Sequence, residues 1–233
     1  MFSGKKAVIF DMDGTLIDSI GLWSEVDLAL IRTLAPENPP VIDDLRARRD
    51  SVLAAAKSDP YLTWCAHLGK LCASSLSAAE IHDLRYRIAG DFQRNSVRYR
   101  PGAAELIRAL HARGMALAIA STTRRANMDI YRLENAAIRT EADIDTCFSA
   151  VYTCDDVKNL KPHPEVYLRV LNDLGLSSEE CLVFEDALIG VQAARAANID
   201  VIAVEEPHSA ADRAEIAARS LAMISDFREL LPL

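Results

Sequence analysis

The sequence lacks the features that mark secreted and membrane-spanning proteins. Its five cysteines are odd in number and show no CxxC or other zinc-ligand spacing, so we expect reduced thiols in a cytoplasmic protein. Apolar runs are short, and Met115–Ala120 is among the longest, whereas a membrane helix needs roughly 18 apolar residues. The apolar run after Lys5 and Lys6 is also too short for a signal peptide. We therefore expect no membrane segment and no secretory leader.

Basic residues are neither in excess nor clustered. The 26 Lys and Arg face 34 Asp and Glu, a net charge of −8, which argues against a nucleic-acid partner and for a small-molecule substrate. Half of the 233 residues are hydrophobic, enough for one sizeable core or for a core domain that carries a smaller insert. We expect a monomer or a small homo-oligomer.

A short apolar run near the start ends in two carboxylates one residue apart. Ala7–Phe10 suits a strand buried on both faces of a parallel sheet, and Asp11 and Asp13 follow it directly. In extended backbone these side chains would project in the same direction, roughly 6 to 7 Å apart. Two carboxylates so close favour a bound cation or unequal protonation. Gly14 then permits a sharp turn, and Thr15 adds a hydroxyl.

Later apolar runs alternate with helical patterns. Strands are predicted near 115–120, 150–153, 181–184 and 201–204, with helices between them and a weaker helix and strand before Asp226. This alternation predicts an α/β fold, a doubly wound parallel sheet with a Rossmann-like core. The stretch 135–147 is interpreted as an ordinary solvated connection.

Between the first strand and residue 98 the pattern is wholly helical. Asp18 or Ser19 is expected to cap the first of these helices, Asp59 precedes Pro60 as a second cap, and Ser77 with Glu80 forms a capping box. The sequence thus predicts an inserted all-helical domain over residues 17–97, with an α/β catalytic core formed by 1–16 and 98–233.

Polar residues follow several predicted strands. Besides Asp11 and Asp13, these are Ser121, Lys161 in the loop after the third strand, and Glu185 with Asp186. Taken singly, Ser121 could cap a helix, Lys161 could be a solvated lysine, and the two acids could begin a helix. In an open parallel sheet, however, strand carboxyl ends meet at one edge, where ligands bind. Several acids there predict Mg²⁺, and the lysine and hydroxyl suit phosphate.

In these motifs the sequence strongly resembles the haloacid dehalogenase superfamily. The resemblance rests on Asp11–Ser19, Ser121 after an apolar strand, Lys161-Pro162-His163-Pro164, and Phe184–Ala194, which are the four motifs of that family in order. The helical insert resembles the cap of its first subclass, which contains phosphoglycolate phosphatase-like and β-phosphoglucomutase-like enzymes.

The resemblance implies a role for each site residue. Asp11 would be the nucleophile that forms an aspartyl-phosphate, and Asp13 would be the general acid and base. Asp11, Asp13 through its main-chain carbonyl, Asp186, and Glu185 directly or through water would hold Mg²⁺. Ser121 would bind the transferring phosphoryl group, and Lys161 would steady its charge. These roles imply a Mg²⁺-dependent hydrolase of a small phosphate monoester, such as a sugar phosphate or phosphoglycolate.

Some residues depart from the family pattern. Ala187 stands where serine is common, Asn198 replaces a frequent glycine, and Leu160 replaces the usual small residue before the lysine. Asparagine tolerates the left-handed conformation that this glycine would adopt. Substrate contacts are expected from Thr122, Arg49 and Arg46.

Two other functions stay open at this point. A β-phosphoglucomutase-type enzyme would use the same aspartyl-phosphate but return the phosphoryl group to a sugar, and Thr15 leans against it because such mutases often have valine there. A phospho-acceptor signalling module would combine similar groups, but its accepting aspartate lies on a middle strand of the chain and it carries no cap.

Overall fold

The protein divides into two compact units. The computed structural model describes residues 2–57 and 59–233. The larger unit contains the chain up to Ile20 and then Val97–Leu233, and the smaller unit contains Gly21–Ser96. The chain therefore leaves the larger unit once and returns to it once.

The larger unit is built on one parallel sheet. Its strands are β1 (Ala7–Phe10), β2 (Ala116–Ala120), β3 (Ala150–Tyr152), β4 (Cys181–Glu185), β5 (Asp200–Val204) and β6 (Ala222–Ile224). Their order is β3-β2-β1-β4-β5-β6, with every neighbouring pair parallel. This order reverses direction at β1, as in doubly wound sheets that bind ligands at the reversal point. The predicted fold class is confirmed.

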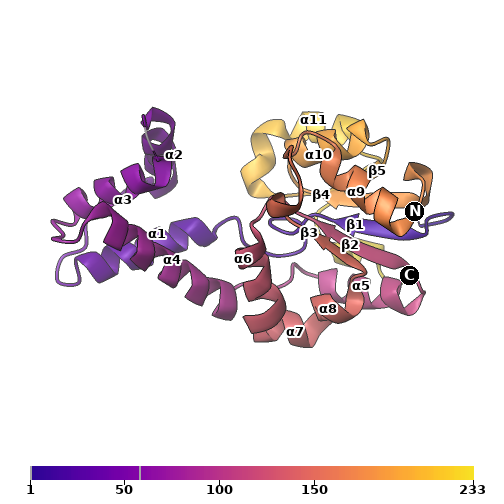
Figure 1. Ribbon diagram of the computed structural model, residues 1–233, viewed down its shortest axis with the longest axis horizontal. Helices are drawn as coiled ribbons and strands as arrows, with labels where there is room; N and C mark the ends of the chain where they lie inside the picture. Colours follow the sequence, from indigo (N-terminus) through magenta and orange to yellow (C-terminus); the bar gives the residue numbers. More distant parts are fainter. Residues whose placement is uncertain (1, 58) are drawn as a thin grey trace. The chain divides into compact units, whose positions relative to one another are not determined.

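Helices cover both faces of this sheet (Figure 1). The α-helices are α5 (Ala103–Ala112), α6 (Arg125–Asp129), α7 (Ala136–Ala142), α8 (Ile144–Cys147), α9 (Glu165–Leu174), α10 (Leu188–Ala196) and α11 (Arg213–Arg219). Shorter helical turns are η1 (Ile130–Glu134), η2 (Cys154–Asp156), η3 (Ser178–Glu180), η4 (Pro207–Asp212) and η5 (Phe227–Leu230). Helices α9, α10 and α11 pack on one face, where their apolar side chains join those of β1, β2, β4 and β5 in one buried cluster.

In the described residues of the smaller unit, all regular secondary structure is helical. It contains α1 (Leu22–Leu34), α2 (Leu45–Ala55), α3 (Pro60–Leu71) and α4 (Ala78–Asn95). Its core includes Leu30, Trp64 and Ile81. Asp59 caps α3 through two backbone amides, and Ser77 and Glu80 form the predicted capping box of α4.

The prediction that Asp18 or Ser19 caps the first helix of the insert is wrong. Helix α1 begins only at Leu22, after Gly21, which makes no side-chain capping bond. The preceding residues stay with the sheet unit, because Ile17 bridges to both Asp13 and Tyr99. Ser19 instead donates a hydrogen bond to the Asp13 carboxylate.

The interpretation of 135–147 as a solvated connection is also wrong. This stretch forms α7 and α8, and Asn135 is fully buried. Its side chain caps α7 at the Ile138 amide and donates to the Val97 carbonyl at 3.0 Å. Ile138 and Ile144 are buried too. The two helices are too short for their apolar spacing to stand out among the many charged residues of the stretch.

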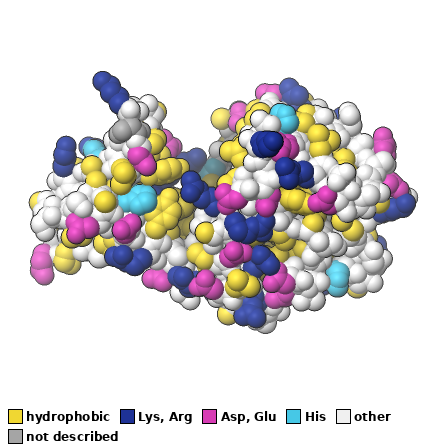
Figure 2. Space-filling view, in the orientation of Figure 1, with side chains coloured by type: hydrophobic (Ala, Val, Ile, Leu, Met, Phe, Trp, Pro, Cys, Tyr) yellow, Lys and Arg dark blue, Asp and Glu magenta, His cyan; other side chains and the backbone are white. Residues whose placement is uncertain are grey.

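The face of the molecule shown in Figure 2 carries charges of both signs. On the face shown in Figure 2, Lys and Arg side chains alternate with Asp and Glu rather than forming one basic area. Within residues 2–57 and 59–233, no helix has both the length and the apolar character that crossing a bilayer requires.

Candidate active site

The candidate site lies where the strand order reverses. Asp11 follows β1 directly, Glu185 ends the neighbouring strand β4, and Phe10 and Phe184 are register partners. The Asp11 amide continues the ladder by donating to the Phe184 carbonyl at 3.0 Å. Parallel pairing therefore brings together two acids that are 174 positions apart in the sequence.

Lys161 joins these acids from the loop before α9. Its Nζ donates to Asp11 Oδ1 at 2.7 Å, to Glu185 Oε1 at 2.5 Å and to the Ala120 carbonyl at 2.8 Å. An ammonium group has three protons, so each has an acceptor. The Lys161 side chain is only 3% exposed, and burial of this kind requires such complete pairing.

The buried group contains three carboxylates and one ammonium. Asp11, Glu185 and Asp186 are buried, and one oxygen from each lies within 4.8 Å of the others. With Lys161 paired to two of them, the group carries an excess of negative charge in a low-dielectric setting. An all-oxygen donor set with excess negative charge suits a hard divalent cation. These three residues could therefore hold such an ion.

The pKa values of the group reflect its burial. Burial raises the pKa of Asp11 well above its usual range, although Lys161 opposes the shift. Burial and then the Glu185 charge raise the pKa of Asp186 to about 7. For Lys161 burial acts in the opposite direction, but the Asp11 and Glu185 charges outweigh it and raise its pKa. The ammonium therefore stays charged at neutral pH.

Asp13 occupies a separate polar environment. Its Oδ1 accepts a 2.6 Å hydrogen bond from Ser19 Oγ, the contact that replaces the predicted cap. Burial raises its pKa, and the Ser19 hydrogen bond opposes that rise. The Asp13 carboxylate does not belong to the close group of Asp11, Glu185 and Asp186. The two aspartates of the first motif thus face different partners.

The turn after Asp13 packs against Asp186. Thr15 Oγ1 donates to Asp186 Oδ1 at 2.8 Å. Gly14 has φ +83°, and a Cβ there would lie 2.5 Å from Asp186 Oδ2, so both its conformation and its surroundings require glycine.

Arg100 fastens this turn to the loop after β5. Its guanidinium donates to the carbonyls of Gly14 and Glu205 and pairs with Glu206 at 3.3 Å. Arg100, Glu206 and Asp186 border a cavity of about 330 Å³. Asp186 therefore borders a cavity that lies within the sheet unit.

Ser121 lies at the end of β2 in a braced loop. Its amide donates to the Tyr152 carbonyl at 3.0 Å, and its Oγ accepts the Thr123 amide at 3.1 Å. The Thr123 carbonyl in turn accepts the Cys154 amide. The Lys161 bond to the carbonyl of Ala120 places the ammonium beside the start of this loop.

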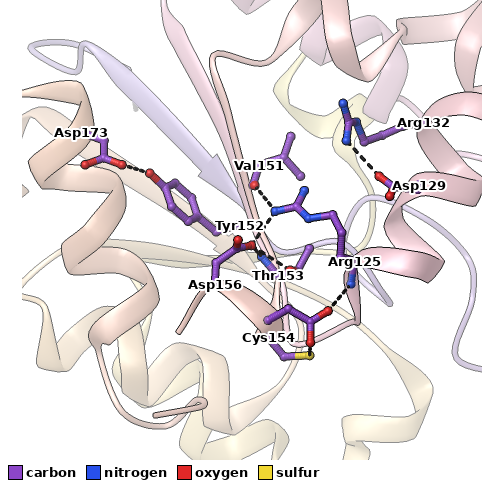
Figure 3. Close-up of polar contacts among 10 residues, drawn as sticks. Arg125, Asp129, Arg132, Val151, Tyr152, Thr153, Cys154, Asp156 and Asp173 are labelled. Carbon is purple, nitrogen blue, oxygen red and sulfur yellow. Dashed lines mark hydrogen bonds and ion pairs between the residues drawn. The ribbon is translucent and has the colours of Figure 1, made fainter. Parts of the chain in front are cut away.

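An arginine holds the neighbouring loop in place (Figure 3). Arg125 donates from its side chain to Asp156 at 2.5 Å and to the Val151 carbonyl at 3.0 Å, while its amide donates to Asp155. Asp156 also accepts the amide and hydroxyl of Thr153. The loops after β2 and β3 are thereby linked near the site.

Of the three predicted substrate contacts, one lies in the sheet unit and two lie in the helical unit. Thr122 is exposed in the loop after β2. Arg46 and Arg49 belong to the helical unit, where Arg46 lies 3.8 Å from Asp50 and Arg49 lies 3.2 Å from Asp27. Each arginine thus has a carboxylate neighbour within its own unit.

Sequence reasoning missed two residues of the site. The Tyr167 hydroxyl donates to Glu185 Oε1 at 2.6 Å, and a Cβ on Gly190 would lie 1.9 Å from the same oxygen. In the sequence, Tyr167 occupies an apolar position of the helical pattern between the predicted strands at 150–153 and 181–184. The spacing of a buried tyrosine is the same whether or not its hydroxyl serves a site, so no sequence signal marked it.

Comparison with known proteins is consistent with this geometry. The family model for haloacid dehalogenase-like hydrolases matches residues 5–198. Protein CbbY of Rhodobacter capsulatus is 33% identical over 89% of this chain and 88% of its own. A phosphorylated carbohydrates phosphatase of Thermotoga maritima is 31% identical over 84% and 83%. The crystal structure of CbbY from Rhodobacter sphaeroides in complex with phosphate has a TM-score of 0.68 at 24% identity, covering 97% of this chain and 96% of that one.

Proposed function

The chain belongs to the haloacid dehalogenase-like hydrolase family, and from that membership we propose that it is a phosphatase of small phosphorylated metabolites. The observation that carries the proposal is the buried arrangement of Asp11, Glu185, Asp186 and Lys161 at the strand reversal. A sugar phosphate or phosphoglycolate-type substrate is proposed because relatives are named as a phosphatase of phosphorylated carbohydrates and as phosphoglycolate phosphatases.

Asp11 is proposed as the nucleophile. A carboxylate oxygen of Asp11 attacks phosphorus, the bond from phosphorus to the ester oxygen breaks, and an aspartyl-phosphate forms. Lys161 Nζ, 2.7 Å from Asp11 Oδ1, orients the carboxylate and offsets charge on the phosphoryl oxygens. The carboxylate needs to be ionised to attack, and the ammonium favours that form.

Asp13 is proposed as the general acid and base. The carboxyl proton of Asp13 passes to the departing ester oxygen, and the resulting carboxylate then takes a proton from the water that attacks the phosphorus of the acyl phosphate. Inorganic phosphate leaves and Asp11 is regenerated. The burial that raises the pKa of Asp13 supports this role, because the group must hold its proton for part of the cycle.

Mg²⁺ is the proposed cation of the acidic group. Asp11 and Asp186 would hold it through their carboxylates, Asp13 through its main-chain carbonyl and Glu185 directly or through water. When bound, the ion would offset the repulsion between the carboxylates and the anionic substrate. The excess of buried carboxylates over ammonium groups supports this proposal.

Substrate choice is assigned to the helical unit, proposed as a cap, and to the loop after β2. Ser121 would donate to the phosphoryl group. Thr122, Arg49 and Arg46 are proposed to contact the remainder of the substrate. Because the phosphate group is common to all phosphate monoesters, selectivity among them is proposed to come from contacts to the remainder of the substrate.

The purified protein tests this proposal directly. A panel of phosphorylated metabolites is incubated with Mg²⁺, and free phosphate and isomerised sugar phosphate are both quantified. We expect free phosphate, lost on chelation and restored by added Mg²⁺. Isomerised sugar phosphate without free phosphate would instead show a mutase, the alternative that uses the same intermediate. A stable phosphoprotein without turnover would show a phospho-acceptor module.

A further inference from the structure

Two donors converge on one oxygen of Glu185. Lys161 Nζ donates to Oε1 at 2.5 Å, and the Tyr167 hydroxyl donates to the same atom at 2.6 Å. Tyr167 is fully buried on α9, and Lys161 Nζ lies 5.2 Å from the centroid of its ring. Tyr167 thus contacts both members of the buried ion pair.

The core around Tyr167 does not require its hydroxyl. The ring packs in the apolar cluster formed by helices α9 to α11 and the sheet, with members such as Ala120 and Val183. Phenylalanine would occupy nearly the same volume without a polar group that needs a buried partner. Because the hydroxyl donates to Glu185, its removal would affect the acidic group of the site rather than the packing of the core.

The Glu185 carboxylate is confined from more than one direction. Besides the two donors, the backbone at Gly190 approaches it so closely that a Cβ would lie 2.0 Å from the carboxyl carbon. Its side chain is only 2% exposed. With the hydroxyl removed, one of the two hydrogen bonds that fix the orientation of the carboxylate is lost.

We propose that Tyr167 is a positioning residue, whose hydroxyl orients Glu185 so that Lys161 is held against Asp11. This inference rests on the proposed phosphatase function for its kinetic consequence, but the geometric claim stands on the contacts alone. All three Lys161 protons have acceptors, so a rotated Glu185 changes the direction of the ammonium group as a whole. The proposed nucleophile, Asp11, would then lose its alignment with the ammonium group. Tyr167 itself makes no hydrogen bond to Asp11; its hydroxyl donates to Glu185.

Tyr167→Phe and a matched control test this proposal. Tyr152→Phe removes another tyrosine hydroxyl that donates to a carboxylate, that of Asp173, outside the acidic group (Figure 3). In the full-length protein we expect Tyr167→Phe to lower kcat about tenfold and to leave KM within about threefold, because the lost bond is to a charged group. Tyr152→Phe is expected to leave both values unchanged.

A second measurement reads the geometry without any substrate. Hydrogen exchange of the Lys161 ammonium protons is followed by ¹⁵N NMR in both variants. We expect exchange at least about threefold faster in Tyr167→Phe than in wild type, because Glu185 is then a less firmly oriented acceptor for Lys161, and we expect exchange to be unchanged in Tyr152→Phe. Unchanged or slower exchange would overturn the proposal.

A double variant shows whether Tyr167 acts through Glu185. If it does, Tyr167→Phe should have no further effect on kcat in a Glu185→Gln background, and additive losses would overturn the inference. A Tyr167→Phe protein that does not fold would assign the hydroxyl to stability and overturn it as well. If the wild type hydrolyses no phosphate monoester, the proposed function fails, while the exchange measurement still decides the role of Tyr167.

Discussion

Gly190→Ala is the substitution with the most sharply defined consequence for the site. An added Cβ would lie 1.9 Å from Glu185 Oε1 and 2.2 Å from Oε2, far inside any van der Waals contact. The carboxylate is the end of a flexible side chain, but Lys161 and Tyr167 hold Oε1 at 2.5 and 2.6 Å. Relieving the clash moves that oxygen by more than 1 Å, which breaks both hydrogen bonds.

The expected loss of stability has two sources, the steric clash of the added Cβ and the broken hydrogen bonds. Overpacking of a buried site costs about 1 to 3 kcal/mol, and loss of a hydrogen bond to a charged group costs about 1.5 to 3 kcal/mol. With both hydrogen bonds lost, we therefore expect the free energy of unfolding to fall by about 4 to 9 kcal/mol and the melting midpoint to fall by about 8 to 36 °C. Because Lys161 loses a partner, kcat should fall at least about tenfold.

Urea unfolding and steady-state kinetics measure both effects. Gly21→Ala is the matched control, since a Cβ there meets nothing within 4 Å and φ is an ordinary −70°. That control should change stability by less than about 1 kcal/mol. If Gly190→Ala behaves like the control in both stability and kcat, the account of Glu185 as a confined carboxylate is wrong.

Two further predictions concern the loops that carry site residues. Glu165 accepts the Lys158 and Asn159 amides at 2.9 Å each, which lowers its pKa from 4.5 to about 2. Because the folded-state pKa of Glu165 is depressed, the stabilising effect of its carboxylate is complete above about pH 4.5 and disappears as the pH falls toward 2. In urea titrations Glu165→Gln should therefore be less stable than wild type at pH 6, and the two stabilities should converge below pH 3. Arg125→Met should speed amide hydrogen exchange at Cys154 several-fold, because Arg125 links the loops after β2 and β3. Arg132→Met, the control, removes comparable exposed ion pairs (Figure 3) and should not change that exchange. Equal effects of the two substitutions would contradict the role of Arg125 in linking these loops.

Strand ends were the part of the site that the sequence predicted well. Lys161 lies within hydrogen-bonding distance of both Asp11 and Glu185, because each of these residues follows or ends a strand of one parallel sheet or lies in the loop beyond it, and strand periodicity is a strong signal. Asn198 adopts φ +58°, as expected for a residue that replaces glycine after a helix. In such places local sequence and global topology agree.

The errors arose where tertiary contacts outweigh local signals. Serine is a residue type that commonly caps helices, but the hydroxyl of Ser19 donates its hydrogen bond to Asp13 instead. Asn135 looked like part of a polar loop, yet it is buried and caps α7 while holding the Val97 carbonyl. Tyr167 matched a helix pattern that phenylalanine would match equally well. Each role depends on a partner that sequence spacing cannot identify.

The central claim is that Asp11 carries the phosphoryl group. Wild-type protein is mixed with a hydrolysed substrate and Mg²⁺, quenched in acid during turnover, and reduced with borohydride, which converts an aspartyl-phosphate to homoserine. Mass spectrometry of the peptide that contains residue 11 should find homoserine at that position in wild type. Asp11→Asn, which keeps the size of the side chain, should fold normally and show neither turnover nor the modified peptide. Turnover by Asp11→Asn, or a phosphorylated residue elsewhere in the chain, would contradict the account.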